Sequence, residues 1–474
     1  MKTSVYRSIT MLLALMLIGL GCLSSPAGAK KHMHFANMRP MVFVHGYTGS
    51  AAQFEWQAMR FASNGYPQNY LNAFEYDSSN YATTADEVLA ALDERIDTVL
   101  QETGADKIDL LGHSLGTYVS MAYLNSSPER AAKVAHYVNL DGQGATSLPG
   151  GVPTLAIWAE IRFIPGSPIP TIVGAENYFA YDQAHNETCT SPESFALMYE
   201  FFTGRDPIST AVLPEPSGHI KLAGRAVLFP DNVGVAGATL EIYEVDGDTG
   251  ARKFRRPEAV YAIDETGNFG PFKARAGANY EFNIARDSGN HHFYFEPRIR
   301  SDYFLRLNTA LPGQGLGDLM TMNPDQTNLI ITRNREFIGD RNDGFDDILA
   351  INGVNIVTAA NAYSSHMLVA YFICDWNSDQ VTELTPPIPV PALNTTFLSG
   401  VDLYLRGSAP PDATISIVDT PRGDCGSMHA INVPDWAIIN ESGTFTESVS
   451  VVLDDYIPSR CDDTWSPRHG HRNW

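Results

Sequence analysis

The chain has 474 residues, which is enough for two or three domains that each bury a core. Its apolar fraction of 44% is ordinary for a globular protein and excludes a largely disordered chain. The formal net charge of −22 would repel a polyanion, so the composition argues against a nucleic-acid partner.

The first 29 residues have the pattern of a secretory leader. Two basic residues precede the apolar stretch at 9–22, and small residues at 27–29 provide a cleavage site. We therefore predict a signal peptide over residues 1–29 and a secreted or extracytoplasmic protein. An uncleaved membrane anchor is the alternative, and a lipoprotein anchor at Cys22 is disfavoured because the residues before it fit that signal poorly.

From residue 30 to about 216, apolar strand-like runs alternate with helical patterns. This alternation predicts a mostly parallel sheet with helices on both faces. The second predicted helix begins with a capping box, Thr84-x-x-Glu87, and ends at Gly104. The predicted strands are 41–44, 108–111, 134–140 and 154–158, and further helical stretches are 53–64, 115–125 and 191–202.

After residue 216 the pattern changes to short alternating runs separated by turns rich in glycine and aspartate. Such a pattern predicts all-β, sandwich-like structure. We assign residues 217–305 to one β-sandwich-like domain and residues 306–474 to a β-rich C-terminal domain, either separate from the first or continuous with it. The prolines at 386–391 predict a stiff connector.

The most informative motif is Gly112-His113-Ser114-Leu115-Gly116, between the strand at 108–111 and the helix at 115–125. A G-x-S-x-G at such a junction is typical of a nucleophile elbow, in which a sharp turn exposes the serine hydroxyl. His45-Gly46-Tyr47 follows the strand at 41–44 and predicts an oxyanion loop. The backbone N–H groups of Tyr47 and Leu115 would then be the two oxyanion donors.

A serine nucleophile needs a histidine base and a carboxylate that orients the base. His185 occupies the expected place in chain order, in a loop after the last strands. For the acid we favour Asp141, at the end of the strand at 134–140, over Glu160 at the end of the next strand. Asp182 ranks third.

These residues resemble those of the α/β-hydrolase lipases and esterases, over roughly residues 38–205. With the β-rich half added, the chain is similar to the prokaryotic two-domain long-chain lipases, in which a C-terminal β domain helps to bind lipid. The resemblance implies a serine ester hydrolase acting on acylglycerols without a cofactor, with Ser114, Asp141 and His185 as its triad.

Several other features are less specific. The aromatic residues at 291–297 and 303–304 would form either a lipid-docking surface or the core of alternating strands, and the core is favoured. His291-His292 lacks further metal ligands, and the acidic run at 339–347 departs from calcium-loop spacing. Asn186-Glu-Thr suggests an exposed loop. Four cysteines, Cys189, Cys374, Cys425 and Cys461, suggest disulfides in an exported protein.

Two other functions compete with ester hydrolysis. An acyltransferase would use an alcohol acceptor in place of water. A catalytically idle lipid- or surface-binding protein would keep the fold alone, but the ordered set of nucleophile, acid, base and oxyanion loop argues against it.

Overall fold

The computed structural model describes residues 38–341, 346–384, 395–423, 428–439 and 447–455. The predicted leader at 1–29, the proline connector at 386–391, Cys425 and Cys461 therefore lie outside the described residues. Residues from Arg39 onward form one compact unit. None of the described helices is long and apolar enough to cross a membrane.

The first part of the chain folds around a six-stranded sheet in which every neighbouring pair of strands is parallel, in the order β2-β1-β3-β4-β5-β6. Strands β1, β3 and β5 are buried along their whole length, which explains their apolar runs. The predicted α/β class is confirmed. The strands are β1 Met41–Val44, β2 Leu71–Phe74, β3 Ile108–His113, β4 Val134–Leu140, β5 Thr154–Ala159 and β6 Glu176–Ala180.

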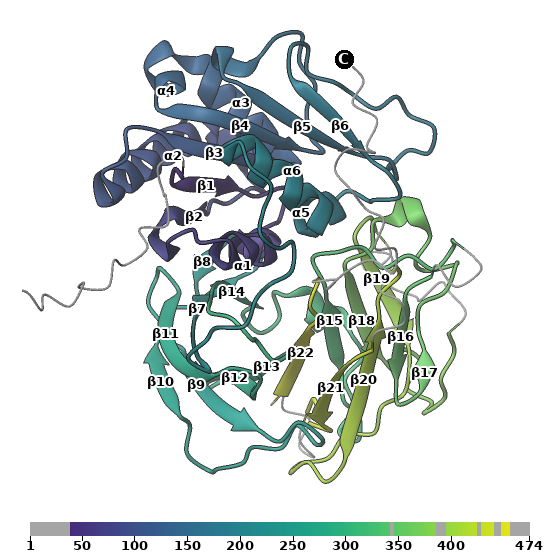
Figure 1. The fold of residues 1–474 in the computed structure, drawn as a ribbon. Helices are drawn as coiled ribbons and strands as arrows, with labels where there is room; N and C mark the ends of the chain where they lie inside the picture. Colours follow the sequence, from purple (N-terminus) through teal and green to yellow (C-terminus); the bar gives the residue numbers. More distant parts are fainter. Residues whose placement is uncertain (1–37, 342–345, 385–394, 424–427, 440–446, 456–474) are drawn as a thin grey trace, which may run out of the picture. The chain divides into compact units, whose positions relative to one another are not determined.

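Helices cover both faces of this sheet, α2 and α3 on one and α1, α5 and α6 on the other (Figure 1). The α-helices are α1 Glu55–Ser63, α2 Tyr81–Thr103, α3 Leu115–Ser126, α4 Pro128–Ala132, α5 Glu187–Thr190 and α6 Pro192–Thr203. The short 3-10 helices here are η1 Ala51–Phe54, η2 Gln68–Tyr70 and η3 Pro149–Gly151.

Helix α2 begins at Tyr81, three residues before the capping box that the sequence suggested. Thr84 lies inside the helix with non-helical backbone angles, and its hydroxyl donates to the carbonyl of Asn80. The hydroxyl therefore bonds backward along the chain, which is the alternative that threonine side chains offer to capping. The helix ends as predicted, with Gly104 in the left-handed conformation.

The second part of the chain is built on one long sheet of eight strands, in the order β10-β9-β12-β13-β22-β15-β18-β19. Strand β22 lies in its middle and pairs in parallel with β13 on one side and β15 on the other. The sheet therefore continues across the boundary predicted at residue 305. Its strands are β9 Thr239–Val245, β10 Ala259–Ala262, β12 Asn279–Arg286, β13 Gly289–Phe295, β15 Leu329–Thr332, β18 Ala370–Cys374, β19 Leu398–Asp402 and β22 Glu447–Val452.

Two smaller sheets pack on the long one, each with its own apolar core. One core joins the sheet β11-β7-β14, with β8 at its edge, to the β9-β12-β13 half. The other joins the sheet β17-β16-β20-β21 to the β15-β18-β22 half. The remaining elements are β7 His219–Leu228, β8 Val233–Gly234, β11 Asn268–Arg275, β14 Asp302–Thr309, η4 Leu316–Leu319, β16 Ile348–Ile351, β17 Val354–Asn355, η5 Ser364–His366, β20 Thr414–Thr420 and β21 His429–Pro434.

The aromatic segment at 291–297 belongs to these cores. Phe293, Tyr294 and Phe295 are all buried, so this segment is not an exposed lipid-docking surface. His291 bonds to Thr309 and Ser450, and His292 lies between Glu281 and Glu447, so hydrogen bonds rather than a metal account for both imidazoles.

The acidic run at 339–347 does not form a calcium loop in its described part, because the carboxylate of Asp347 is buried against Arg333. Across the described ranges, no cluster of histidine, cysteine or carboxylate side chains is able to hold a metal ion. Cys189 and Cys374 are buried free thiols, contrary to the disulfides expected for them. Asn186 is also buried, so the loop that carries it is not the exposed one its sequence suggested.

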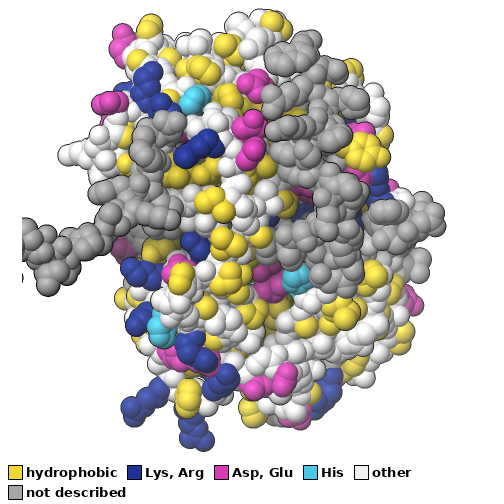
Figure 2. Space-filling view, in the orientation of Figure 1, with side chains coloured by type: hydrophobic (Ala, Val, Ile, Leu, Met, Phe, Trp, Pro, Cys, Tyr) yellow, Lys and Arg dark blue, Asp and Glu magenta, His cyan; other side chains and the backbone are white. Residues whose placement is uncertain are grey.

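The surface charge is not spread evenly. Figure 2 shows Lys and Arg side chains gathered on one face in the region of β9, β10 and β11. The exposed basic residues along this stretch are Lys253, Arg255, Arg256, Lys273 and Arg275. Although the net charge of the chain is negative, the second part of the chain therefore carries a local positive patch.

Candidate active site

Ser114 lies in the turn between β3 and α3, with φ 52° and ψ −120°. This is a region that non-glycine residues rarely occupy and that costs about 1–3 kcal/mol. The Ser114 amide donates to the carbonyl of Leu140 at 3.1 Å, and its carbonyl accepts from Thr117. The turn is thus fixed from both sides, as expected for a nucleophile elbow.

The two glycines of the motif permit close backbone packing at this turn. A Cβ on Gly116 would lie 2.1 Å from the carbonyl oxygen of Val44, and a Cβ on Gly112 would lie 2.6 Å from that of Gly116. The first turn of α3 therefore rests directly on the end of β1, which brings the serine next to the His45-Gly46 loop.

The loop after β1 passes close to the serine. A Cβ on Gly46 would lie 3.0 Å from the Cβ of Ser114. The Gly46 amide donates to Oε1 of Gln53 at 3.0 Å, whereas the Tyr47 amide makes no hydrogen bond with any described residue. Leu115 is the first residue of α3, so its amide lies among those without an intrahelical acceptor.

His45 fixes this loop rather than reacting. Burial lowers the pKa of His45 to about 3, so the ring is neutral at neutral pH. Nearby arginines lower the pKa as well, whereas the hydrogen bond to Gly46 raises it. Its Nδ1 donates to the Gly46 carbonyl at 2.9 Å, and its Nε2 accepts from the Tyr76 amide at 3.3 Å. The ring also stacks on Tyr76.

His185 and Asp141 lie in contact. Asp141 follows β4 with φ 41°, and its Oδ2 lies 2.7 Å from Nδ1 of His185. Its Oδ1 accepts from the Ala159 amide at 3.0 Å and from Arg162 at 2.7 Å. Both carboxylate oxygens are therefore occupied by donors, and the contact through Nδ1 leaves Nε2 of the imidazole as the ring nitrogen that can act as a base.

Glu160 and Asp182 lie elsewhere. Glu160 is exposed, and its carboxylate accepts from the Asp182 amide at 2.8 Å. The Asp182 carboxylate pairs with Arg341 and Arg422. Of the three candidate acids, only Asp141 contacts His185 in the structure.

The base also contacts the elbow. The ring of His113 lies 4.5 Å from the ring of His185, centroid to centroid, and its Nε2 donates to the His185 carbonyl at 3.2 Å. Burial lowers the pKa of His113 well below its usual range, so this ring is a neutral donor. The edge of Phe163 packs against His185 at 4.7 Å.

The sequence interpretation did not include four of these residues in the site: Gln53, His113 as a hydrogen-bond donor, Arg162 and Phe163. Arg162 lies only two residues after Glu160, but a single arginine in a loop carries no distinctive pattern. Fixed backbone turns and an oriented imidazole are the arrangement that nucleophilic acyl transfer requires. Together, the parallel sheet, the elbow and the loops around it have the arrangement of the α/β-hydrolase fold.

Three segments of the chain match the models of known protein families. Residues 38–128 match the family model of class 2 lipases, residues 218–312 match that of the lipase C-terminal domain, and residues 315–457 match a further C-terminal domain family. The first part of the chain is therefore similar to class 2 lipases, and the part that follows is similar to lipase C-terminal domains.

Individual relatives are distant. Lipase member N of Homo sapiens is 24% identical over 145 residues, which are 30% of this chain and 35% of that protein. The chain thus matches about a third of the length of this relative. A predicted CIB-like hydrolase from Thermoplasma acidophilum is similar at 18% identity, with a TM-score of 0.28 over 36% of this chain and 88% of its own. Aspergillus fumigatus lipase B is similar at 14% identity, with a TM-score of 0.29 over 37% and 55%.

Proposed function

We propose that the protein is a serine carboxylic-ester hydrolase that cleaves acylglycerols through an acyl-enzyme. The contact between His185 Nδ1 and Asp141 Oδ2, in a loop that packs against the Ser114 elbow, is the observation that supports this most strongly. Ser114 would be the nucleophile, His185 the base and Asp141 the acid. The amides of Tyr47 and Leu115 would stabilise the oxyanion.

In the first half-reaction, Ser114 Oγ forms a bond to the ester carbonyl carbon while its proton passes to Nε2 of His185. The tetrahedral oxyanion then collapses, the bond to the alcohol oxygen breaks, and the alcohol leaves with the proton from His185. In the second half-reaction, water loses a proton to His185 and attacks the acyl-enzyme. The carboxylic acid is released, and the proton returns to Ser114.

The surface near the elbow suits an apolar acyl group. Exposed large apolar side chains near the elbow or on the loop after β5 are Tyr47, Tyr118, Phe163 and Ile164, and Ile164 is 70% exposed. A lipid–water interface would therefore contact the first part of the chain through these side chains. The aromatic side chains of β13 are buried and would not contact it. We further propose that the chain is exported through its predicted leader.

A series of p-nitrophenyl esters from butyrate to palmitate, assayed on the wild type and on Ser114→Ala, tests this function. The wild type is expected to retain activity on the long acyl chains. Ser114→Ala is expected to lose at least about 10³-fold in kcat at unchanged circular dichroism, because alanine has no hydroxyl to form the acyl-enzyme. Activity retained by the folded variant would disprove the assignment.

A further inference from the structure

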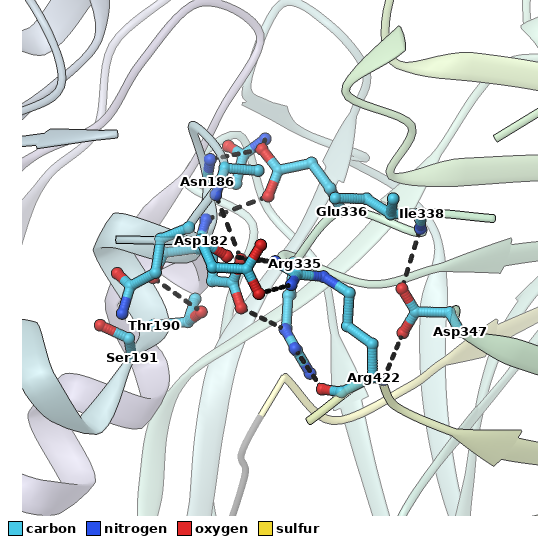
Figure 3. A network of polar contacts seen from close by, with 12 residues as sticks. Asp182, Asn186, Thr190, Ser191, Arg335, Glu336, Ile338, Asp347 and Arg422 are labelled. Carbon is cyan, nitrogen blue, oxygen red and sulfur yellow. Dashed lines mark hydrogen bonds and ion pairs between the residues drawn. The ribbon is translucent and has the colours of Figure 1, made fainter. Parts of the chain in front are cut away.

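The loop that carries His185 is bound by a carboxylate from a distant part of the chain. Oε1 of Glu336 accepts from the amide of Asn186 and, at 3.0 Å, from its side-chain nitrogen. Oε2 accepts from the Glu187 amide at 3.1 Å. Figure 3 shows Glu336 reaching these groups from the segment after β15. One carboxylate thus binds the two residues that directly follow the histidine.

The residue before His185 is held through a second carboxylate. Oε2 of Glu187 accepts from the Ala184 amide at 3.1 Å. Glu187 in turn is paired with Arg335, whose Nε lies 3.0 Å from Oε1, and with Arg422. Both sides of His185 are therefore fixed by charged groups, and Glu336, Arg335 and Arg422 all come from residues 315–457 (Figure 3).

Glu336 itself is held rigidly. Arg333 is fully buried between Asp347, at 2.9 Å, and Asp419, at 3.0 Å. Its guanidinium donates to the carbonyls of Arg335 at 3.1 Å and Glu336 at 2.6 Å. The buried Arg333 thus holds the backbone of Arg335 and Glu336, the two residues whose side chains bind the His185 loop. Each guanidinium nitrogen of Arg333 has an acceptor, as a buried polar group that fixes geometry requires.

The charge of Glu336 also bears on the site. The side chain is buried, and its two oxygens contact only N–H donors, an environment that suits the ionised form. Burial, together with the nearby Glu187 carboxylate, raises the pKa of Glu336 above its ordinary value, although the Asn186 amide and His185 act in the opposite direction. When ionised, Glu336 carries a negative charge next to the residue that follows His185, and this charge favours the imidazolium that forms when His185 takes the serine proton.

We propose that Glu336 is a positioning residue for His185, acting through the amides of Asn186 and Glu187, so that the C-terminal part of the chain completes the catalytic geometry. This inference rests on the proposed function. In this arrangement the C-terminal part does more than add surface, because the amides of Asn186 and Glu187 have their acceptor there, in Glu336.

The test compares Glu336→Gln, Glu336→Asp and the wild type on p-nitrophenyl butyrate. Glutamine keeps the size of the side chain but places a donor against one of the two amides. We expect kcat to fall about 10- to 100-fold with KM unchanged, since a shift of about 1 Å in a catalytic group has an effect of this order. The acidic limb of kcat/KM should move to lower pH. Aspartate keeps the charge but is too short for both amides, so it should lower kcat while leaving that limb in place.

Glu281→Gln is the matched control, because Glu281 is equally buried but pairs with Arg252 and His292 in the second part of the chain. Its kcat per folded molecule should equal that of the wild type. If Glu336→Gln behaves like this control, the positioning role is wrong. If Glu336→Gln does not fold, Glu336→Asp decides the matter, since an unchanged kcat overturns the role. Ser114→Ala in the same assay keeps the two proposals separate: activity in that variant removes the proposed function, whatever Glu336 does.

Discussion

Ser114 and Asp141 share an unusual feature, since both have positive φ values at the ends of neighbouring strands. Strain at a non-glycine residue persists only where surrounding contacts fix it. Here the contacts are the Leu140 carbonyl for Ser114, and the Ala159 amide with Arg162 for Asp141. Both side chains are thereby directed to where the proposed chemistry needs them.

The assignment of the acid can be tested at this scale. Asp141→Asn should lower kcat by about 10³- to 10⁴-fold. The amide oxygen would keep the donors of Oδ1, so the NH2 group would face Nδ1 of His185, donate to it and favour the wrong tautomer. Glu160→Gln should leave kcat within about twofold, since Glu160 is exposed and away from the imidazole. Steady-state kinetics of both variants would decide the question. A large loss confined to Glu160→Gln would show that the acid is misassigned.

At the scale of elements, the site depends on how closely α3 and β1 approach. Their contact has no room for a side chain, because the backbone of Val44 and His45 lies against Gly116. The elbow and the oxyanion loop are therefore one packed unit. A change in the spacing of the helix and the strand would move both the nucleophile and the oxyanion donors.

Gly116→Ala tests this coupling. The added methyl would overlap backbone atoms that cannot rotate away, so we expect a loss of about 3 kcal/mol in the free energy of unfolding, together with reduced kcat in the folded fraction. Urea denaturation and activity titration would measure both. Gly317→Ala is the control, because its Cβ would meet only the ends of two flexible side chains, Ile330 at 3.3 Å and Met320 at 3.8 Å. Equal effects of the two substitutions would contradict the coupling.

At the scale of the whole molecule, buried charges join α1 to the β part. Arg298 contacts three carboxylates, those of Glu55 on α1, Asp302 and Asp454. Asp455 is buried beside them, and among the described residues neither of its oxygens has a hydrogen-bond partner. The cluster thus holds more negative than positive charge away from water. Such a cluster is costly when every acid is ionised.

This excess predicts a pH-dependent stability. Burial raises the pKa of Asp455 to about 7, from an ordinary value of 3.8. The native state then binds more protons than the unfolded state, so stability is present in full below pH 3.8 and is lost as pH rises through about 7. We expect Tm to fall between pH 5 and 8, and Asp455→Asn to flatten that slope. Asp248→Asn, at an exposed position, should leave the slope unchanged, and an unchanged slope in Asp455→Asn would refute the prediction.

The sequence patterns identified the candidate site residues, but they did not identify the residues that hold them in place. Ser114, His185 and Asp141 belong to local patterns at strand ends, and chain order placed them on one edge of a parallel sheet. Strand β6 was missed because Glu176–Ala180 has no long apolar run and only its last residue is buried. Glu336 carries no local signal, since it acts on Asn186 from 150 residues away. Alternating strands likewise could not say whether the aromatics of β13 face a core or water.

Strand β22 has a consequence for how the chain is made. It is the last described strand, yet it lies between β13 and β15 in the middle of the eight-stranded sheet. During synthesis from the N-terminus, the two halves of this sheet exist before the strand that joins them has left the ribosome. A chain stopped short of residue 447 would contain Ser114, Asp141, His185 and Glu336. It would lack β22, the strand that pairs with both halves of the sheet. Completion of the eight-stranded sheet thus waits until β22 has been synthesised.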